Sequence, residues 1–127
     1  MDMTVVKVEP GKKAQLVKIE NSLKGMQTVV GGLIQVISPF DDDVALVCNE
    51  EGKMLCLPLN RTLKETGDII CGTFFICGAP ADAEYFDSLT KEQIVKYYKM
   101  FEFPEHFYLD KENGITSVQF NFDEEER

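Results

Sequence analysis

The sequence predicts an α+β fold: a single compact domain with a largely antiparallel sheet of hairpins (five to eight strands), one short helix and one longer helix. Short apolar runs separated by turn residues make up most of the chain, and this pattern is typical of hairpins. Only two segments show the spacing of an amphipathic helix. The 127 residues suit one domain, and a hydrophobic content of 44% is ordinary for a globular protein.

We expect residues 1–122 to form this domain, since no repeat, linker or low-complexity segment divides them. Residues 123–127 have nothing to bury, so they are predicted to be an acidic end that frays.

Residues 4–8 and 14–20 flank a Pro-Gly turn and are predicted to pair as an antiparallel hairpin. If Glu9 pairs with Lys12, one face of this hairpin is apolar and the other is partly basic. The apolar face would carry Val6, Val8, Val17 and Ile19. The short helix is expected next, capped by Asn21 or Ser22 and ended by two glycines, and residues 33–38 follow as a strand.

A second hairpin is predicted between residues 44–48 and 53–57, with a loop that ends at Gly52. Both of its sides are apolar, so we expect it to be covered on both faces or to lie against a second subunit. Residues 68–78 form a continuous apolar run, which predicts one buried strand with Gly72 inside it.

The longer helix is predicted to begin at Thr90, where Gln93 completes a capping box, and to stop before Pro104. Its apolar stripe consists of Ile94, Tyr97, Tyr98 and Phe101. A last hairpin is expected around Asn113-Gly114, a dipeptide typical of two-residue hairpin loops. That loop would place Leu109 opposite Val118 and Phe107 opposite Phe120.

The net charge of −9 is unevenly spread, with +2 in residues 1–40 and −11 in the remainder. This balance argues against direct binding to nucleic acid, whose phosphates must be neutralised by lysine and arginine. It leaves open a basic partner or a small anionic ligand held by a local positive site. The four cysteines lie in apolar runs and are expected to be buried, reduced thiols. No apolar stretch approaches ~18 residues, so we expect a cytoplasmic protein without a membrane segment.

Catalytic and metal-binding patterns are absent from the sequence, which contains no GxSxG, HExxH, P-loop or dinucleotide fingerprint. We therefore predict no catalytic residues, no metal site and no cofactor. The acidic triplet Asp41-Asp42-Asp43 is interpreted as a solvated turn, because a magnesium site needs oxygen ligands from several segments. His106 is expected to be a surface residue.

The predicted ligand-binding residues are polar or basic groups at the ends of apolar strands: Arg61, Asn60, Asn49 and Lys53. Arg61 can hold a phosphate or carboxylate through paired N–H donors, and Asn60 can pair with a base edge or a ribose hydroxyl. Structural alternatives stay open. Asn49 can cap the turn that follows it, and Arg61 can pair with an internal acid such as Glu65.

Five segments carry a resemblance to a known family: VEPG, VVGGLIQVISPFDD, VALVCNEEGK, LPLNRTL and DIICGTFFICG. Together they resemble an uncharacterised domain-of-unknown-function family of phages, conjugative elements and gut Firmicutes. The resemblance runs from Val5 to Gly78 and continues more loosely through SLTKEQI and the FxFPE turn. It implies a small accessory protein of a mobile element in a bacterial host cell, and it supplies no catalytic residues.

Our leading hypothesis is a non-enzymatic accessory protein that binds and sequesters a small anionic ligand, with a nucleotide immune signal as the candidate and anti-defence as the role. A homo-oligomer is expected, because tight burial of the ligand favours a pocket at a subunit interface. The alternative is an acidic protein-interaction inhibitor or nucleic-acid mimic that blocks a host defence protein through residues 41–43 and 123–126. An enzyme that combines separated acids with Tyr97 or Tyr98 ranks third.

Overall fold

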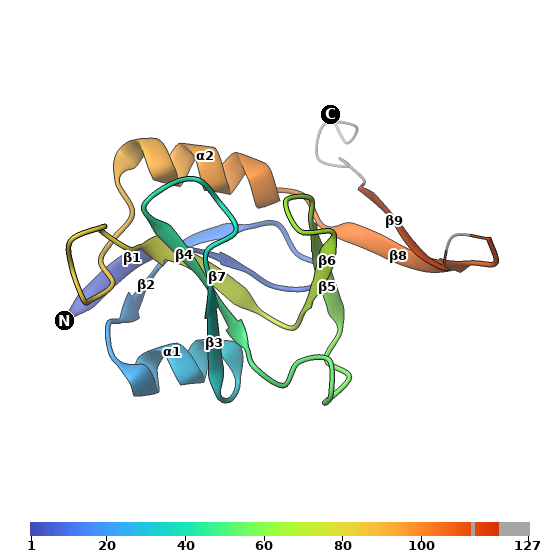
Figure 1. Cartoon of the computed structure of the whole chain (residues 1–127), viewed down its shortest axis with the longest axis horizontal. Coiled ribbons are helices and arrows are strands. Elements are labelled where there is room, and N and C mark those ends of the chain that lie inside the picture. The colour runs from blue at the N-terminus through green and yellow to red at the C-terminus, as the bar shows by residue number, and fades with distance from the viewer. Residues whose placement is uncertain (113, 120–127) are drawn as a thin grey trace.

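A computed structural model describes residues 1–112 and 114–119 of the protein. Five antiparallel strands form the main sheet in the order β2-β1-β7-β4-β3 (Figure 1). These strands are β1 (Asp2–Val8), β2 (Gln15–Glu20), β3 (Ile34–Ile37), β4 (Val44–Asn49) and β7 (Phe74–Gly78). Two-stranded ribbons are formed by β5 (Leu59–Leu63) with β6 (Asp68–Cys71), and by β8 (Glu105–Asp110) with β9 (Gly114–Gln119). The predicted α+β class is confirmed; the expected frayed end, 123–127, lies outside the described residues.

The helices α1 (Leu23–Val30) and α2 (Lys91–Phe101) cover opposite faces of the main sheet (Figure 1). Met26 and Val30 of α1 pack into one core cluster, and Tyr97 and Phe101 of α2 pack into another. Neighbouring residues of a central strand point into different cores, because side chains alternate across a sheet. All six residues of β4 are buried for this reason.

Both helices begin where the sequence predicts. The Ser22 hydroxyl, rather than Asn21, caps α1 by accepting a hydrogen bond of 2.9 Å from the Gly25 amide. At α2, Thr90 and Gln93 form the expected capping box, with each side chain accepting a hydrogen bond from the other residue's backbone amide.

The first hairpin forms, but its predicted register is wrong by one residue. Val6 lies opposite Leu16 and Val5 opposite Val17. Val6 and Val8 therefore face the α2 side, while Val17 and Ile19 face the α1 side together with Val5. The expected basic face does not exist in β1, because both of its faces are covered by a helix.

The second predicted hairpin is wrong. Residues 50–56 form consecutive turns, and β4 pairs instead with β3 and β7. Within the turns the Leu55 amide donates to the Glu51 carbonyl and the Leu57 amide to the Gly52 carbonyl. Since β4 is covered on both faces by its own chain, the apolar hairpin no longer supports a second subunit, and the homo-oligomer stays a prediction.

The single strand predicted at residues 68–78 is also wrong, because it divides into β6 and β7 at Gly72. Gly72 has a φ of 87°, a left-handed conformation that glycine adopts without strain. β6, before the break, lies outside the main sheet and pairs with β5, a strand that the sequence analysis did not predict, while β7, after the break, joins the main sheet.

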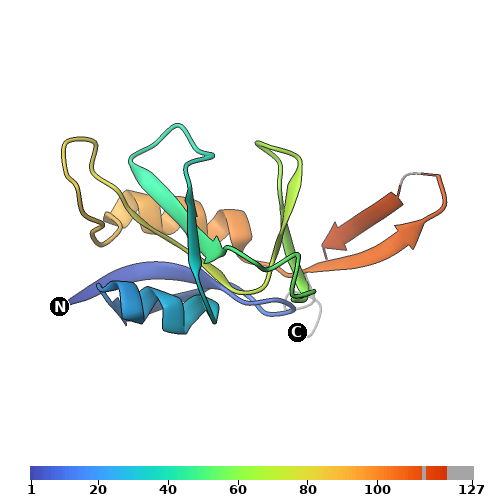
Figure 2. The ribbon, with the colours of Figure 1, turned by 60° about the horizontal axis from the view of Figure 1, so that its bottom comes forward.

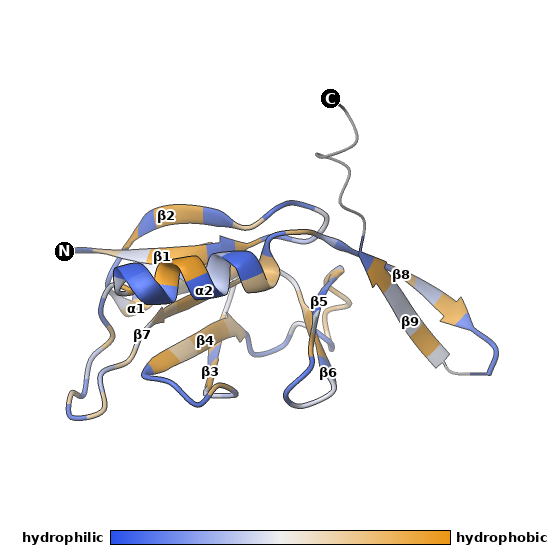
Figure 3. Ribbon diagram, turned by 90° about the horizontal axis from the view of Figure 1, so that it is seen from above, coloured by the Kyte–Doolittle hydropathy of each residue, from blue (hydrophilic) through white to orange (hydrophobic). Residues whose placement is uncertain are grey.

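The ribbon β8–β9 projects from the rest of the molecule, and we call it the arm (Figure 2). Leu109 lies opposite Ile115 and Phe107 opposite Ser117, so the predicted pairings with Val118 and Phe120 are wrong. The Asp110–Gly114 pair leaves three residues in the loop instead of two. Figure 3 shows apolar positions on both strands of the arm, and Leu109 is 81% exposed.

Candidate functional site

Asp68, the first residue of β6, lies in the walls of three adjoining cavities. The β3 cavity, about 590 Å³, lies between the end of β3 and the β5–β6 turn. The arm cavity, about 680 Å³, lies between β5, β6 and Ile115 of the arm. The turn cavity, about 370 Å³, lies between Gln35, the end of β4, the turns after it and β6. All three volumes fall within the range of small-molecule sites.

Lys53 lines both the arm cavity and the turn cavity, and its ammonium forms an ion pair with the Asp68 carboxylate. The hydrogen bond from Lys53 lowers the pKa of Asp68, and the same bond raises the pKa of Lys53. Both groups are therefore charged at neutral pH. The Ile69 amide also donates to Asp68, at 2.8 Å, and fixes the direction of the carboxylate.

The close approach of the turns to β6 explains how Lys53 comes to lie beside Asp68. A Cβ atom at Gly52 would lie 2.6 Å from the Cys71 carbonyl oxygen, so a larger residue could not occupy this position without displacing backbone. The turns therefore bring Lys53, which follows Gly52, to the start of β6.

The walls of the arm cavity are mostly apolar. They consist of Cys56, Leu57, Pro58, Leu59, Ile69, Cys71 and Ile115, with Gly67 and the Lys53–Asp68 pair. Among the described residues that line the three cavities, Lys53 is the only basic one. An apolar cavity with one ammonium group at its wall can hold a molecule that combines an apolar body with an anionic group.

Thiols gather at the same place. Cys48 and Cys71 line the turn cavity, and burial raises the pKa of Cys48 to about 11. Burial also raises the pKa of Cys71, so both thiols are protonated and poor nucleophiles at neutral pH. Cys56 is exposed and has a φ of 57°, so the expectation that all four cysteines are buried is wrong for this residue.

Asn49 lines the turn cavity, but its amide is used inside the protein. Its Nδ2 donates to the Val30 carbonyl at 3.2 Å, and its Oδ1 accepts from the Glu51 amide at 2.7 Å. The bond from Glu51 is the turn-capping alternative considered for this residue, and the bond to Val30 ties Asn49 to the end of α1. A ligand role for Asn49 stays a prediction.

Asn60 and Arg61 lie inside β5 rather than at a strand end, and both side chains are fully buried. Arg61 Nη2 donates to the carbonyls of Lys12 (2.6 Å) and Phe101 (3.0 Å), and Nη1 donates to Asn60 Oδ1 (2.9 Å). Asn60 Nδ2 donates to the carbonyls of Val8 (2.9 Å) and Gly72 (2.8 Å). We call this pair the β5 clamp.

The hydrogen bonds of the β5 clamp are all made within the protein, as in the structural alternative considered for Arg61. The partners of Arg61 include backbone carbonyls, not the internal acid Glu65 named in that alternative. Burial lowers the pKa of Arg61 to about 10, while the charge of Glu105 opposes that shift. The Glu105 carboxylate is held nearby by the amide and hydroxyl of Thr62 and by the hydroxyl of Ser117. The structure thus brings Lys53 and Asn49 together at the cavities and places Asn60 and Arg61 in a separate clamp.

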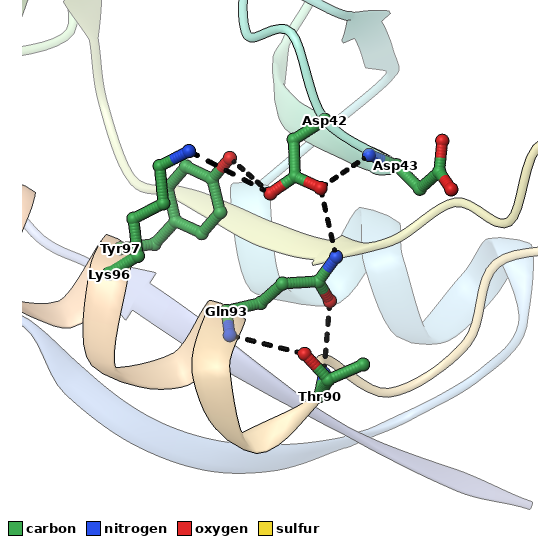
Figure 4. A network of polar contacts seen from close by, with 6 residues as sticks. All are labelled: Asp42, Asp43, Thr90, Gln93, Lys96 and Tyr97. Atoms are coloured by element: carbon green, nitrogen blue, oxygen red, sulfur yellow. Dashed lines mark hydrogen bonds and ion pairs between the residues drawn. The ribbon is translucent and has the colours of Figure 1, made fainter.

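A second polar cluster was missed by the sequence analysis (Figure 4). The Asp42 carboxylate accepts hydrogen bonds from the Tyr97 hydroxyl (2.9 Å) and from Gln93 Nε2 (3.3 Å), and it pairs with Lys96 at 3.9 Å. The spacing of Gln93 and Tyr97, one helical turn apart, was the available signal. Asp42 is therefore not a free solvated acid, whereas Asp41 and Asp43 are exposed.

Residues 123–126, the other acids of the inhibitor hypothesis, lie outside the described residues.

The enzyme hypothesis combined an acid with Tyr97 or Tyr98, and the structure places Asp42 beside Tyr97. The Tyr97 side chain, however, is fully buried. Within residues 1–112 and 114–119, no group of three or more His, Cys, Asp or Glu side chains is arranged to hold a metal ion. No helix in this part of the chain is long and apolar enough to cross a membrane.

Fold and cavities together define an antiparallel α+β domain with a cavity of ligand size between its β5–β6 ribbon and the arm. Residues 3–102 match the family described as Domain of unknown function (DUF3846), and the chain belongs to this family. The match includes the main sheet, both helices and the β5–β6 ribbon, and it ends before the arm. Neither a curated protein nor a solved structure is detectably similar to the chain.

Proposed function

We propose that the protein is a non-enzymatic binding protein that sequesters a small anionic ligand in the arm cavity. The observation that carries this proposal is the position of Lys53, the one basic side chain in the cavity walls among the described residues, beside an apolar space of about 680 Å³. The ligand would place its anionic group at the ammonium and its apolar body between Leu57, Leu59 and Ile69.

Displacement of Asp68 from Lys53 costs little. The two side chains are 64% and 52% exposed, and an ion pair as exposed as this contributes at most about 1 kcal/mol. A multiply charged anion can therefore replace the carboxylate at the ammonium. The freed Asp68 then accepts a hydrogen bond from a ligand hydroxyl.

A nucleotide satisfies all three requirements, with its phosphate at Lys53, a ribose hydroxyl at Asp68 and its base against the apolar wall. Anti-defence sequestration of a nucleotide signal, by an accessory protein of a phage or other mobile element in the bacterial cytoplasm, is the biological role we propose. Two observations support this role. The sequence contains no recognised catalytic motif, and several of its segments resemble mobile-element proteins. The homo-oligomer belongs to the same proposal, and light scattering with and without nucleotide tests it.

Calorimetric titration and thermal-shift measurements with linear and cyclic nucleotides test the binding. We expect at least one nucleotide to raise the melting temperature, since a ligand stabilises the state that it binds. Lys53→Met keeps the apolar stem and should abolish that shift, whereas Lys64→Met, at an exposed lysine outside the arm cavity, should leave it unchanged. No shift with any nucleotide at concentrations far above micromolar would remove the proposal.

A further inference from the structure

The strand β3 forms one edge of the main sheet and carries no charged side chain to guard that edge, although it is short and Pro39 follows it closely. Residues 31–40 contain no charged residue, and β3 pairs only with β4 among the described strands. Exposed edge strands are normally guarded by charges, prolines or bulges, because their free amides and carbonyls can pair with another chain. The opposite edge, β2, is guarded by Lys18 and Glu20.

Two of the cavities adjoin β3, and together we call them the β3 groove. Gln35 and Ile37 of β3 line the turn cavity and the β3 cavity, respectively, and Asp68 lines both. A chain segment that adds to β3 would therefore have room for side chains on the α2 side of the sheet. This combination of backbone pairing and alternate side-chain pockets is how extended peptides are recognised at sheet edges.

The charges around this groove are acidic. Glu50 follows β4 at the end where β3 begins, and its amide donates to the Leu33 carbonyl at 2.8 Å. The exposed Asp41 and Asp43 follow the end of β3, and Asp68 lines the cavities beside both Gln35 and Ile37. Lys53 is already paired with Asp68. The groove therefore favours a basic occupant by charge complementarity.

A second copy of this chain fits the edge poorly. In an antiparallel pair of β3 strands, the beginning of one strand lies beside the end of the other. Glu50 of each copy would then approach Asp41 and Asp43 of the other, and this like-charge contact opposes association.

We propose that β3 is a docking edge for an extended, basic segment of a partner protein, which adds to the main sheet as a sixth strand. The backbone of the segment pairs with β3. Its lysine or arginine side chains reach Glu50, Asp68 and the acids after β3. This interaction shares Asp68 with the ligand proposed for the arm cavity, but it uses neither the Lys53 ammonium nor the apolar wall of that cavity.

A fluorescently labelled synthetic peptide of alternating lysine and valine tests the proposal by anisotropy. We expect it to bind, with an affinity that falls as salt is added, because exposed charges are screened. A matched peptide of alternating glutamate and valine should not bind. Hydrogen exchange should show new protection at Ile34–Ile37 in the complex. Equal binding of the two peptides, or protection elsewhere only, would overturn the proposal.

Two matched variants locate the contact. Val36→Lys adds a guarding charge to β3 at a side chain that is 44% exposed, and Leu16→Lys does the same on β2 at a side chain that is 50% exposed. We expect Val36→Lys to weaken peptide binding by about tenfold or more and Leu16→Lys to leave it nearly unchanged. Thermal melts confirm that both variants fold. An equal effect of the two variants contradicts the docking edge, and so does a dimer of the unmodified chain that Val36→Lys dissociates.

Lys53→Met separates this proposal from the proposed function. Removal of the ammonium frees the Asp68 carboxylate, so the lysine–valine peptide should bind more tightly while the nucleotide is lost. Failure of nucleotide binding therefore leaves the peptide result intact, and failure of peptide binding leaves the nucleotide result intact.

Discussion

Arg61 Nη2 donates a hydrogen bond of 3.0 Å to the carbonyl of Phe101, the last residue of α2. A guanidinium at the C-terminal end of a helix satisfies a carbonyl that has no partner within the helix and interacts favourably with the helix dipole. The same nitrogen donates to Lys12, so one buried side chain joins β5 to α2 and to the first hairpin.

Arg61→Ala should lower the free energy of unfolding by about 2–4 kcal/mol, because it leaves buried carbonyls and the side-chain oxygen of Asn60 without a hydrogen-bond donor. Arg61→Lys should recover only part of this loss, since an ammonium cannot reproduce the planar fork. Urea denaturation measures the change, and calorimetry with the best-binding nucleotide runs in parallel. A clear loss of nucleotide affinity with unchanged stability would instead support the ligand-binding role predicted for Arg61.

Tyr97→Phe removes the hydrogen bond to Asp42 and should cost about 1 kcal/mol of stability, a typical net value for one such bond. The matched control is Tyr98→Phe on the same helix, since the Tyr98 hydroxyl has no hydrogen bond in the described part of the chain. Urea denaturation of both variants is the measurement. An equal effect of the two substitutions would show that the Asp42 contact is not the source of the loss.

Acid should destabilise the protein partly through Asp42. Burial disfavours the ionised carboxylate, but hydrogen bonds from Tyr97, the Asp43 amide and Gln93 outweigh it and lower the pKa of Asp42 below its ordinary value of 3.8. A lowered pKa in the folded state gives stability that is present above 3.8 and is lost as pH falls through the folded-state value. Asp42→Asn should therefore reduce stability at neutral pH and flatten its decline below pH 4, as followed by urea denaturation across pH. A decline as steep as in the unmodified protein would contradict this assignment.

Alkylation should distinguish the cysteines. Iodoacetamide is expected to modify Cys56 first, because Cys56 is exposed. Cys77 is fully buried, and burial raises its pKa to about 12, so it should react only after unfolding. Mass spectrometry of peptides from native and denatured protein measures both rates. Rapid labelling of Cys77 in the native protein would show that the β7 core opens readily.

Much of the fold could be predicted from local signals. The capping residues Ser22 and Thr90 mark both helix starts, and these assignments need only neighbouring residues. Pairing of strands could not be predicted in the same way. Strands such as β4 are apolar on both faces, so alternation of polar and apolar residues gives no register and no partner.

The candidate site was only partly predictable for a related reason. Lys53 was selected because it lies at an end of a predicted apolar strand, but its partner Asp68 belongs to a ribbon that the sequence analysis did not predict, since residues 68–78 were expected to form one buried strand. Arg61 was assigned to a strand end because β5 was not recognised. A basic residue inside an apolar strand signals either a ligand contact or a buried clamp, and the choice between them depends on carbonyls from distant segments.

The burial of β4 between two helix-covered cores has a consequence for motion near the cavities. Its amides should be among the slowest to exchange with solvent, because opening them requires a helix to detach. Cys48 and Asn49 at its end therefore give the turn cavity one stationary wall. The facing wall belongs to β6 and to the turns that carry Lys53, which lie outside the main sheet. β6 and these turns also line the arm cavity, so entry and release of the proposed ligand would require motion of these segments only, at a rate that the main sheet does not limit.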